Sequence, residues 1–208
     1  FATSSSIYGD HPELPKQEDR LGNPISPYAV SKRANELYAS VFSMLYGIQT
    51  IGLRYFNVFG PRQDPNGPYA AVIPRFITGL LKYDHPVIYG DGSFTRDFTY
   101  VENIVHANQL AMVAEKEEAI NKVYNIAGGE RTAIKELANI LNTYLSKFDS
   151  KIANIKIIHE KERLGDIPHS YADIENARRL LGYRAWVSVK EGLHRTCEWF
   201  QKQNLSPE

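Results

Sequence analysis

A helix signal stands directly before a buried-strand signal in the first third of the chain. Ser26 is a typical N-cap residue, Pro27 suits the first helical position, and Gly47 is typical of the residue that ends a helix. The run TIGLRYFNVFG at residues 50–60 is almost continuously apolar and aromatic, which favours a parallel strand covered on both faces. With residues 1–2 as the end of an earlier buried strand, the order strand, loop, helix, strand predicts a doubly wound α/β sheet.

The remainder of the chain also alternates between helix and strand signals. A polar loop rich in Pro, Gly and Asn follows residue 60, and the turn DGS precedes the segment FTRDFTYV. Ser188 and Glu191 have the spacing of a capping box for the final helix. The expected helices lie at 71–81, 101–115, 132–148, 173–181 and 188–203, and the expected strands at 86–90, 122–129 and 153–160.

Composition and charge exclude several classes of partner. Lys plus Arg and Asp plus Glu both number 24, so no overall field attracts nucleic acid or an anionic membrane, and any phosphate site must be local. No segment approaches the roughly 20 apolar residues that span a bilayer. Cys197 is the only cysteine, which excludes an internal disulfide and a thiolate metal cluster. We therefore expect a cytoplasmic protein with no metal site.

One group of side chains has the types needed for proton transfer. Tyr28 and Lys32 are four residues apart and share a helix face with Glu36. A tyrosine acts as a base only as phenolate, and an ammonium group one turn away favours that form through its charge. The serines at positions 4–6 offer hydroxyls that can hold a substrate hydroxyl. Taken singly, such a pair is common by chance, and a triple serine is more often a turn or a cap.

Six motifs occur together and in order between Ser4 and about Trp199. They are SSSIYG, SPYAVSK, LRYFNVFGPRQDP, GDGSFTRDFTYVEN, YNIAGG and RLGDIPHSYADIENARRLLGY. In these motifs the chain resembles the extended short-chain dehydrogenase/reductases, and among them the NAD-dependent nucleotide-sugar epimerases and dehydratases. It most closely resembles UDP-N-acetylglucosamine 4-epimerases of surface-polysaccharide pathways.

The resemblance implies catalytic roles for Ser4, Tyr28 and Lys32. Tyr28 would take the proton from the 4-hydroxyl of the sugar while carbon 4 passes its hydride to NAD. Lys32 would favour the phenolate and bind the nicotinamide ribose, and Phe56 would pack near the nicotinamide. The 4-keto sugar would then turn over and regain the hydride on its other face, so the net result is an inversion. Ser4, Tyr28, Lys32 and Phe56 are thus the expected cofactor-binding residues.

The resemblance also implies a set of residues that bind the UDP-sugar. Arg96 would hold the pyrophosphate, a task that suits a guanidinium group. Ser170 stands where strict galactose/glucose epimerases have a tyrosine, and a serine leaves room for a 2-acetamido group. Without the motifs, burial in a strand or exposure on the surface would be the commoner role of such side chains. The expected set is Ser5, Ser6, Asn57, Arg96, Arg163, Asp166 and Ser170.

The serine motif separates the expected reaction from related ones. Related dehydratases carry Asp and Glu after the catalytic hydroxyl residue, and UDP-glucuronate decarboxylases have Glu where Ser6 stands. The sequence has Ser5 and Ser6 there, which favours inversion at carbon 4 of UDP-N-acetylglucosamine or its uronic acid. A UDP-glucuronate 4-epimerase, or a related nucleotide-sugar dehydratase or decarboxylase, remains the alternative. A truncated, non-catalytic module that binds a sugar nucleotide is the alternative of another class.

The resemblance implies two domains, of which the first is incomplete. Residues 1–67 would form the second half of an NAD-binding Rossmann domain that includes the catalytic helix. Residues 68–208 would form mainly a smaller α/β lobe for the substrate, with segments around 94–127 returning to the Rossmann sheet. The chain would thus hold the C-terminal part of a doubly wound parallel sheet plus this lobe.

Two further expectations concern the cofactor and the assembly. No glycine-rich G-x-G-x-x-G fingerprint is present in the 208 residues, and the chain has no initiating Met. We therefore expect a C-terminal fragment that by itself binds NAD poorly and is inactive. Leu37, Val41 and Leu45 lie on the helix that carries Tyr28 and would supply the interface of a homodimer, although they could equally be core.

Overall fold

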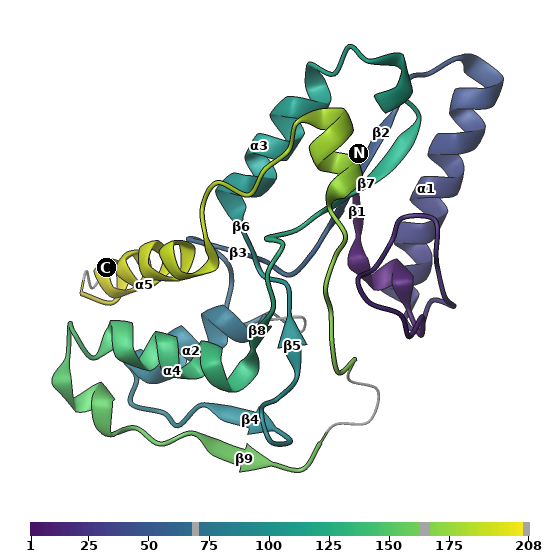
Figure 1. Cartoon of the computed structure of the whole chain (residues 1–208). Coiled ribbons are helices and arrows are strands. Elements are labelled where there is room, and N and C mark those ends of the chain that lie inside the picture. Colours follow the sequence, from purple (N-terminus) through teal and green to yellow (C-terminus); the bar gives the residue numbers. More distant parts are fainter. Residues whose placement is uncertain (68–70, 163–166, 206–208) are drawn as a thin grey trace. The chain divides into compact units, whose positions relative to one another are not determined.

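The structure is a computed structural model that describes residues 1–67, 71–162 and 167–205 (Figure 1). The chain is divided into two compact units. Unit 1 comprises Phe1–Val58, Asp97–Arg131 and Ser170–Trp186. Unit 2 comprises Phe59–Arg96, Thr132–His169 and Val187–Glu208.

Unit 1 is built on a parallel sheet of three strands in the order β1–β2–β7. The strands are β1 (Ala2–Ser4), β2 (Ile51–Tyr55) and β7 (Lys122–Ile126). The central strand β2 pairs with both neighbours in parallel, and the short strand β3 (Val58–Phe59) follows it along the chain. The parallel strands confirm the predicted α/β class.

Helix α1 (Pro27–Tyr46) joins β1 to β2 and has the predicted ends. The Ser26 side chain accepts a hydrogen bond from the backbone N–H of Ala29 at 3.1 Å, and Pro27 occupies the first turn. Gly47 ends the helix in the left-handed conformation, with φ of 68°, which glycine adopts without steric cost. The helix follows the short 3₁₀ helix η1 (Ser5–Tyr8) and a long loop.

The two faces of the sheet have different chemistry. Side chains alternate along a strand, so Leu53 and Arg54 lie on opposite faces. Leu53 belongs to a buried apolar cluster with Ile104 of helix α3 (Val101–Met112) and Leu180, and each such side chain contributes about 1.5–3 kcal/mol by burial. Arg54 instead bonds to Glu36 of α1. Helices α1 and α3 therefore cover opposite faces of the sheet (Figure 1).

The end of unit 1 departs from the predicted helix at 173–181. The regular part is a π-helical turn, Ala177–Leu181, which Gly182 ends with φ of 73°. Asp173 lies outside the helix, where its N–H donates to Lys16 O and its carbonyl accepts from Asn125 Nδ2 instead of an intrahelical N–H. The other short elements of unit 1 are β6 (Thr99–Tyr100) and η2 (Glu117–Ala119).

The start of the chain also departs from expectation. Phe1 is 42% exposed, and Ala2 is exposed as well, so these residues are not the end of a buried strand in this structure. Thr3 is the buried residue of β1.

Unit 2 packs its helices beside two small sheets. Strand β4 (Val87–Tyr89) pairs in parallel with β9 (Ile158–Glu160), and β5 (Thr95–Arg96) pairs antiparallel with β8 (Thr132–Ala133). The pairing of Thr132 and Ala133 delays the predicted helix at 132–148, which begins at Ile134. The helices are α2 (Val72–Leu81), α4 (Ile134–Leu145), the short η3 (Ser150–Asn154) and α5 (Val189–Leu205).

The chain's cysteine has a structural role in the last helix. Cys197 lies buried in α5, and burial raises the pKa of its thiol to about 12, so it serves as a small apolar core residue. None of the helices described for this chain is both long enough and apolar enough to cross a membrane.

Asp97 is a buried carboxylate that joins three separate segments of unit 1. Its Oδ1 accepts the N–H of Gly129 at 3.1 Å, and its Oδ2 accepts the N–H of Ala172 at 3.3 Å. The side-chain amide of Asn57 donates to its backbone carbonyl at 3.0 Å. Burial raises the pKa of the Asp97 carboxyl to about 7, against the opposing effect of the backbone N–H groups.

We expect this carboxyl to make stability depend on pH. Its pKa rises from 3.8 when unfolded to about 7 when folded, so the folded state binds the extra proton between these values. Its contribution is therefore complete below about pH 4 and falls by an amount on the order of 4 kcal/mol as pH rises through 7. Urea unfolding of the wild type and Asp97→Asn should be measured across this pH range. The free energy of unfolding of the wild type, relative to that of the variant, should decrease as pH rises. Parallel curves for the two proteins would contradict the assignment.

Candidate active site

The three serines lie where the first strand meets the carboxyl edge of the sheet. Ser4 is the last residue of β1 and pairs with Tyr55 of β2. It is also the N-cap of η1, and its Oγ accepts the N–H of Ser6 at 3.2 Å. The carboxyl edge of a parallel sheet is where ligands of open α/β folds bind. Ser4 to Ser6 therefore form a corner of hydroxyl groups at this edge.

The Ser6 hydroxyl has an unusual environment. Its Oγ is buried and has no hydrogen-bond partner within the described part of the chain. A buried hydroxyl without a partner costs about 1–3 kcal/mol, and such groups in native proteins usually bond to a water or a ligand. This atom is therefore suited to a polar group that arrives with a ligand.

Tyr28 and Lys32 lie near the start of α1, which packs against both β1 and η1. The Tyr28 side chain is 49% exposed. The Lys32 Nζ lies 5.7 Å from the centre of the Tyr28 ring, within the range of a cation–π contact. The helix therefore presents an accessible phenol with a cation beside it, next to the elements that carry the serines.

Phe56 and Asn57 follow β2 at the same edge of the sheet. Phe56 is completely buried and packs against Tyr8, with 6.0 Å between ring centres. Asn57 is half-buried, adopts φ of 35° and donates its side-chain N–H to Asp97 O. Both side chains thus have structural partners inside unit 1, and their predicted ligand contacts remain predictions.

Ser170 lies in a segment that is held in place by main-chain pairing. The neighbouring Tyr171 accepts the N–H of Lys16 at 2.7 Å, and Asp173 donates to Lys16 O at 3.0 Å. Ser170 itself is half-buried. This segment belongs to unit 1 together with the serines, Tyr28 and Lys32.

One predicted substrate residue that the structure describes falls outside unit 1. Arg96 belongs to β5 in unit 2, where its Nη1 donates to the backbone carbonyls of Thr95 and Pro168 at 3.0 and 3.1 Å. Arg163 and Asp166 lie outside the described residues. The structure therefore brings Ser4, Ser5, Ser6, Tyr28, Lys32, Phe56, Asn57 and Ser170 into one unit.

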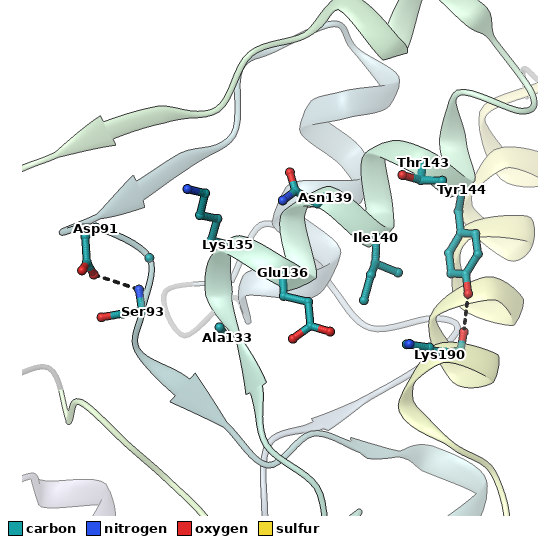
Figure 2. A pocket seen from close by; sticks show the side chains of 11 residues that line it. Asp91, Ser93, Ala133, Lys135, Glu136, Asn139, Ile140, Thr143, Tyr144 and Lys190 are labelled. Carbon is teal, nitrogen blue, oxygen red and sulfur yellow. Dashed lines mark hydrogen bonds between the residues drawn. The ribbon is translucent and has the colours of Figure 1, made fainter.

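Unit 2 contains an open hollow of about 630 Å³ that involves none of these residues (Figure 2). It lies along α4 and reaches the turn at Asp91 to Ser93 and the start of α5 at Lys190. Tyr144 closes one end, where its hydroxyl donates to Lys190 O at 3.3 Å. Lys135 and Glu136 are exposed along it. Its lining residues include no predicted catalytic, cofactor-binding or substrate-binding residue.

Sequence reasoning missed a buried polar cluster around Arg54. The run at 50–60 indicated an apolar strand, yet Arg54 is 3% exposed and bonds to Glu36, Tyr8 and Glu18 O. A signal was present, because a charged residue in the middle of a buried strand needs a partner. Glu36, on the same helix face as Tyr28, was that partner.

Comparison with known proteins gives a consistent family. The chain matches the NAD dependent epimerase/dehydratase family over residues 1–127. It is 38% identical over 205 residues to the "Putative UDP-glucose 4-epimerase" of Methanocaldococcus jannaschii, covering 98% of this chain and 63% of that protein. The chain thus spans about three fifths of the length of the curated relatives it matches.

Solved structures agree with this family. The UDP-N-acetylglucosamine 4-epimerase from Methanobrevibacter ruminantium M1, in complex with UDP-N-acetylmuramic acid, has a TM-score of 0.89 and 42% identity over 98% of this chain and 62% of that chain. The UDP-glucuronic acid 4-epimerase from Bacillus cereus, in complex with UDP-glucuronic acid and NAD, has a TM-score of 0.85 and 31% identity, covering 97% of this chain and 60% of that chain. Other matches include a UDP-N-acetyl-alpha-D-glucosaminuronate decarboxylase.

We expect the N-cap at Ser26 to hold the turn that carries Tyr28. Ser26→Ala removes the bond to the Ala29 N–H and should lower the free energy of unfolding by about 1 kcal/mol. Amide exchange at Ala29 should accelerate as well. Ser31→Ala is the matched control, because its hydroxyl donates to Tyr28 O within the helix, and its effect should stay within about 0.5 kcal/mol. Equal effects of the two variants would contradict a specific capping role.

Proposed function

The chain belongs to the NAD dependent epimerase/dehydratase family, and on that premise we propose that the protein containing it inverts the configuration at carbon 4 of a UDP-hexose. The observation that carries the proposal is the placement of Ser4 at the end of β1 beside the helix that presents Tyr28 and Lys32. A protein that only binds a sugar nucleotide has no need of an accessible phenol with a cation beside it.

The fit of these residues to NAD rests on their chemistry. The unpaired Ser6 hydroxyl, the half-exposed Tyr28 and the Lys32 ammonium offer a donor, a phenol and a cation at the carboxyl edge of the sheet. Lys32 would hold the ribose next to the nicotinamide. When bound, NAD supplies the capacity to accept a hydride from carbon 4 of the sugar and to return it.

The proposed reaction gives Tyr28, Lys32 and Ser4 distinct roles in proton transfer. The Tyr28 oxygen takes the proton of the 4-hydroxyl, and the Lys32 charge stabilises the phenolate that this step requires. Ser4 binds the same hydroxyl and keeps it directed at the tyrosine. The proton returns to the sugar oxygen from Tyr28, so neither residue is changed after a full cycle.

We propose UDP-N-acetylglucosamine, or its uronic acid, as the preferred substrate. Ser170 leaves space where a tyrosine would oppose a 2-acetamido group. A solved relative at 42% identity is named a UDP-N-acetylglucosamine 4-epimerase, which supports this choice. UDP-glucuronate 4-epimerisation is the second candidate, because a relative of that activity has 31% identity over nearly the whole chain. Ser6 in place of a glutamate disfavours decarboxylation.

The proposal includes the behaviour of the chain by itself and its assembly. The 208 residues contain no G-x-G-x-x-G motif, so we propose that this chain alone binds NAD weakly and does not turn over substrate.

We also propose a homodimer through α1, on which Leu37, Val41 and Leu45 are 55%, 42% and 62% exposed. Exposed apolar residues in such a group typically mark a contact surface.

The reaction is tested by removing the phenolic oxygen of Tyr28. In the whole protein, Tyr28→Phe should lower kcat for UDP-sugar epimerisation by about 10²–10⁴, with KM changed little, because the base is lost and the ring is kept. Tyr38→Phe is the matched control, since Tyr38 is a 66% exposed residue of the same helix. The 208-residue chain, titrated with NADH by fluorescence, should not saturate. Full activity of Tyr28→Phe would refute the proposed base.

The substrate preference is tested at Ser170. Ser170→Tyr should lower kcat/KM for UDP-N-acetylglucosamine by about tenfold or more and change that for UDP-glucose by no more than about twofold, because only the acetamido group meets the new ring. Ser170→Ala, which keeps the space, should retain both activities. If acetamido turnover survives the tyrosine intact, the steric argument is wrong.

A further inference from the structure

Three buried polar residues form one row across the parallel sheet. In the register of the strands, Thr3 of β1 pairs with Arg54 of β2, and Arg54 pairs with Asn125 of β7. Their exposed fractions are 3%, 3% and 0%. Directly paired residues of neighbouring strands point to the same face. The face of the sheet toward α1 therefore has a polar row where a core would ordinarily be apolar.

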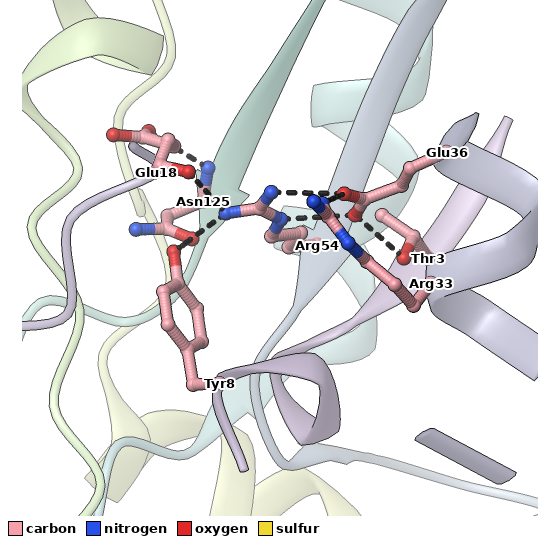
Figure 3. Close-up of polar contacts among 7 residues, drawn as sticks. All are labelled: Thr3, Tyr8, Glu18, Arg33, Glu36, Arg54 and Asn125. Carbon is pink, nitrogen blue, oxygen red and sulfur yellow. Dashed lines mark hydrogen bonds and ion pairs between the residues drawn. The ribbon is translucent and has the colours of Figure 1, made fainter. Parts of the chain in front are cut away.

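Arg54 forms bonds in two directions from the centre of this row (Figure 3). Its Nε and Nη2 donate to the two carboxylate oxygens of Glu36 on α1, both at 2.9 Å. Its Nη1 donates to the Tyr8 hydroxyl and to the Glu18 carbonyl, also at 2.9 Å each. Four of its five N–H donors are thus used with good geometry.

The ends of the network are equally well bonded. Thr3 Oγ1 donates to Glu36 Oε1 at 2.9 Å, and the Tyr8 hydroxyl donates to Asn125 Oδ1 at 2.7 Å. Asn125 Nδ2 donates to the backbone carbonyls of Lys16 and Asp173 at 2.8 and 3.0 Å. The network therefore runs continuously from α1 to the segment that carries Ser170. Figure 3 shows its part from Glu36 to Asn125.

Charge and burial keep both Arg54 and Tyr8 protonated, so each can donate in these bonds. Burial by itself would lower the pKa of Arg54, but the hydrogen bonds and charge of Glu36 outweigh it and raise that pKa. Burial also raises the pKa of Tyr8 to about 12, although Arg54 opposes the shift. Tyr8 therefore stays protonated at neutral pH, accepting from Arg54 and donating to Asn125.

Stability alone does not account for such a network. A buried ion pair is commonly no more stabilising than apolar residues of the same volume, because both charges lose their hydration. What the pair adds is geometry, since two parallel bonds between a guanidinium and a carboxylate fix both distance and orientation. Here the groups so fixed belong to β2 and α1.

Several elements that the network joins carry predicted active-site residues or lie next to them. Glu36 is on α1 with Tyr28 and Lys32, two turns beyond Tyr28 on the same face. Thr3 immediately precedes Ser4, and Tyr8 ends the 3₁₀ helix that contains Ser5 and Ser6. Asn125 bonds to Asp173, three residues after Ser170.

We infer that Arg54 and Glu36 are positioning residues that set the Tyr28–Lys32 face of α1 against the Ser4–Ser6 corner. This inference rests on the proposed function for its catalytic consequence. The geometric consequence is independent of it, because loss of the paired bonds loosens the start of α1 relative to η1 whatever the protein catalyses. Neither residue touches the reacting atoms in this scheme.

The test separates geometry from stability with a double variant of the whole protein. Arg54→Met or Glu36→Leu alone leaves a buried charge unpaired and should lower the urea midpoint strongly. Arg54→Met combined with Glu36→Leu should recover most of the midpoint, since an apolar pair replaces the ion pair, while Thr3 Oγ1 and the Glu18 carbonyl each lose one partner. In this double variant kcat should still fall about tenfold or more while KM stays within about threefold, because misplaced catalytic groups act on the reaction step.

A second measurement does not require activity. Amide hydrogen exchange over residues 26–33 of the double variant should be about tenfold faster than in the wild type, measured without urea, where both proteins are folded. Arg33→Met is the matched control, because Arg33 donates to the same Glu36 at 3.3 Å from a half-exposed position. It should leave kcat and exchange near the wild-type values.

The two measurements distinguish failure of the proposed function from failure of the positioning role of Arg54 and Glu36. A wild type without epimerase activity would sink the proposed function, and exchange over 26–33 would then decide the positioning role by itself. A stable double variant with wild-type exchange would overturn the inference, with or without activity. A stable double variant with faster exchange but wild-type kcat would limit the pair to a structural role and overturn its part in catalysis.

Discussion

The bidentate contact between Arg54 and Glu36 is the constraint on which the arrangement of unit 1 depends. Arg54 is central to the sheet, and Glu36 is a buried acidic residue of α1. An unpaired charge at either position would be costly, so each group requires the other at hydrogen-bond distance. Apolar contacts can tolerate small shifts, whereas two parallel bonds of 2.9 Å cannot. The ion pair therefore fixes where α1 lies along the sheet.

The opposite face of the same strands supplies the stability that this arrangement requires. Leu53, Tyr124 and Ile126 alternate with Arg54 and Asn125 and form an apolar cluster with α3. Burial of such side chains is the main favourable term in folding. The sheet thus divides two tasks between its faces: the α3 face contributes hydrophobic stabilisation, and the α1 face contributes directional bonds. The period of two along a strand makes this division possible.

The local parts of the fold could be predicted from the sequence, and the long-range polar contacts could not. Ser26, Pro27 and Gly47 act within one or two turns of their own helix, so the bounds of α1 follow from them. The segment at 173–181 depends on Lys16 and Asn125, which lie far away along the chain, and the predicted helix there was wrong in its first turn. Thr3, Arg54 and Asn125 meet across the sheet although they lie about 50 and 70 residues apart, and no local signal in the sequence pairs them.

The two tyrosines near the serine corner show how environment divides chemistry between identical side chains. Tyr8 is 2% exposed and has both a donor and an acceptor as partners, and its raised pKa keeps its proton in place. Tyr28 is half exposed on the first turn of α1, with a lysine ammonium group beside its ring. A ligand can therefore reach Tyr28 and not Tyr8. The buried tyrosine is held by bonds on both sides of its hydroxyl, whereas the exposed one is the tyrosine that we propose for proton transfer.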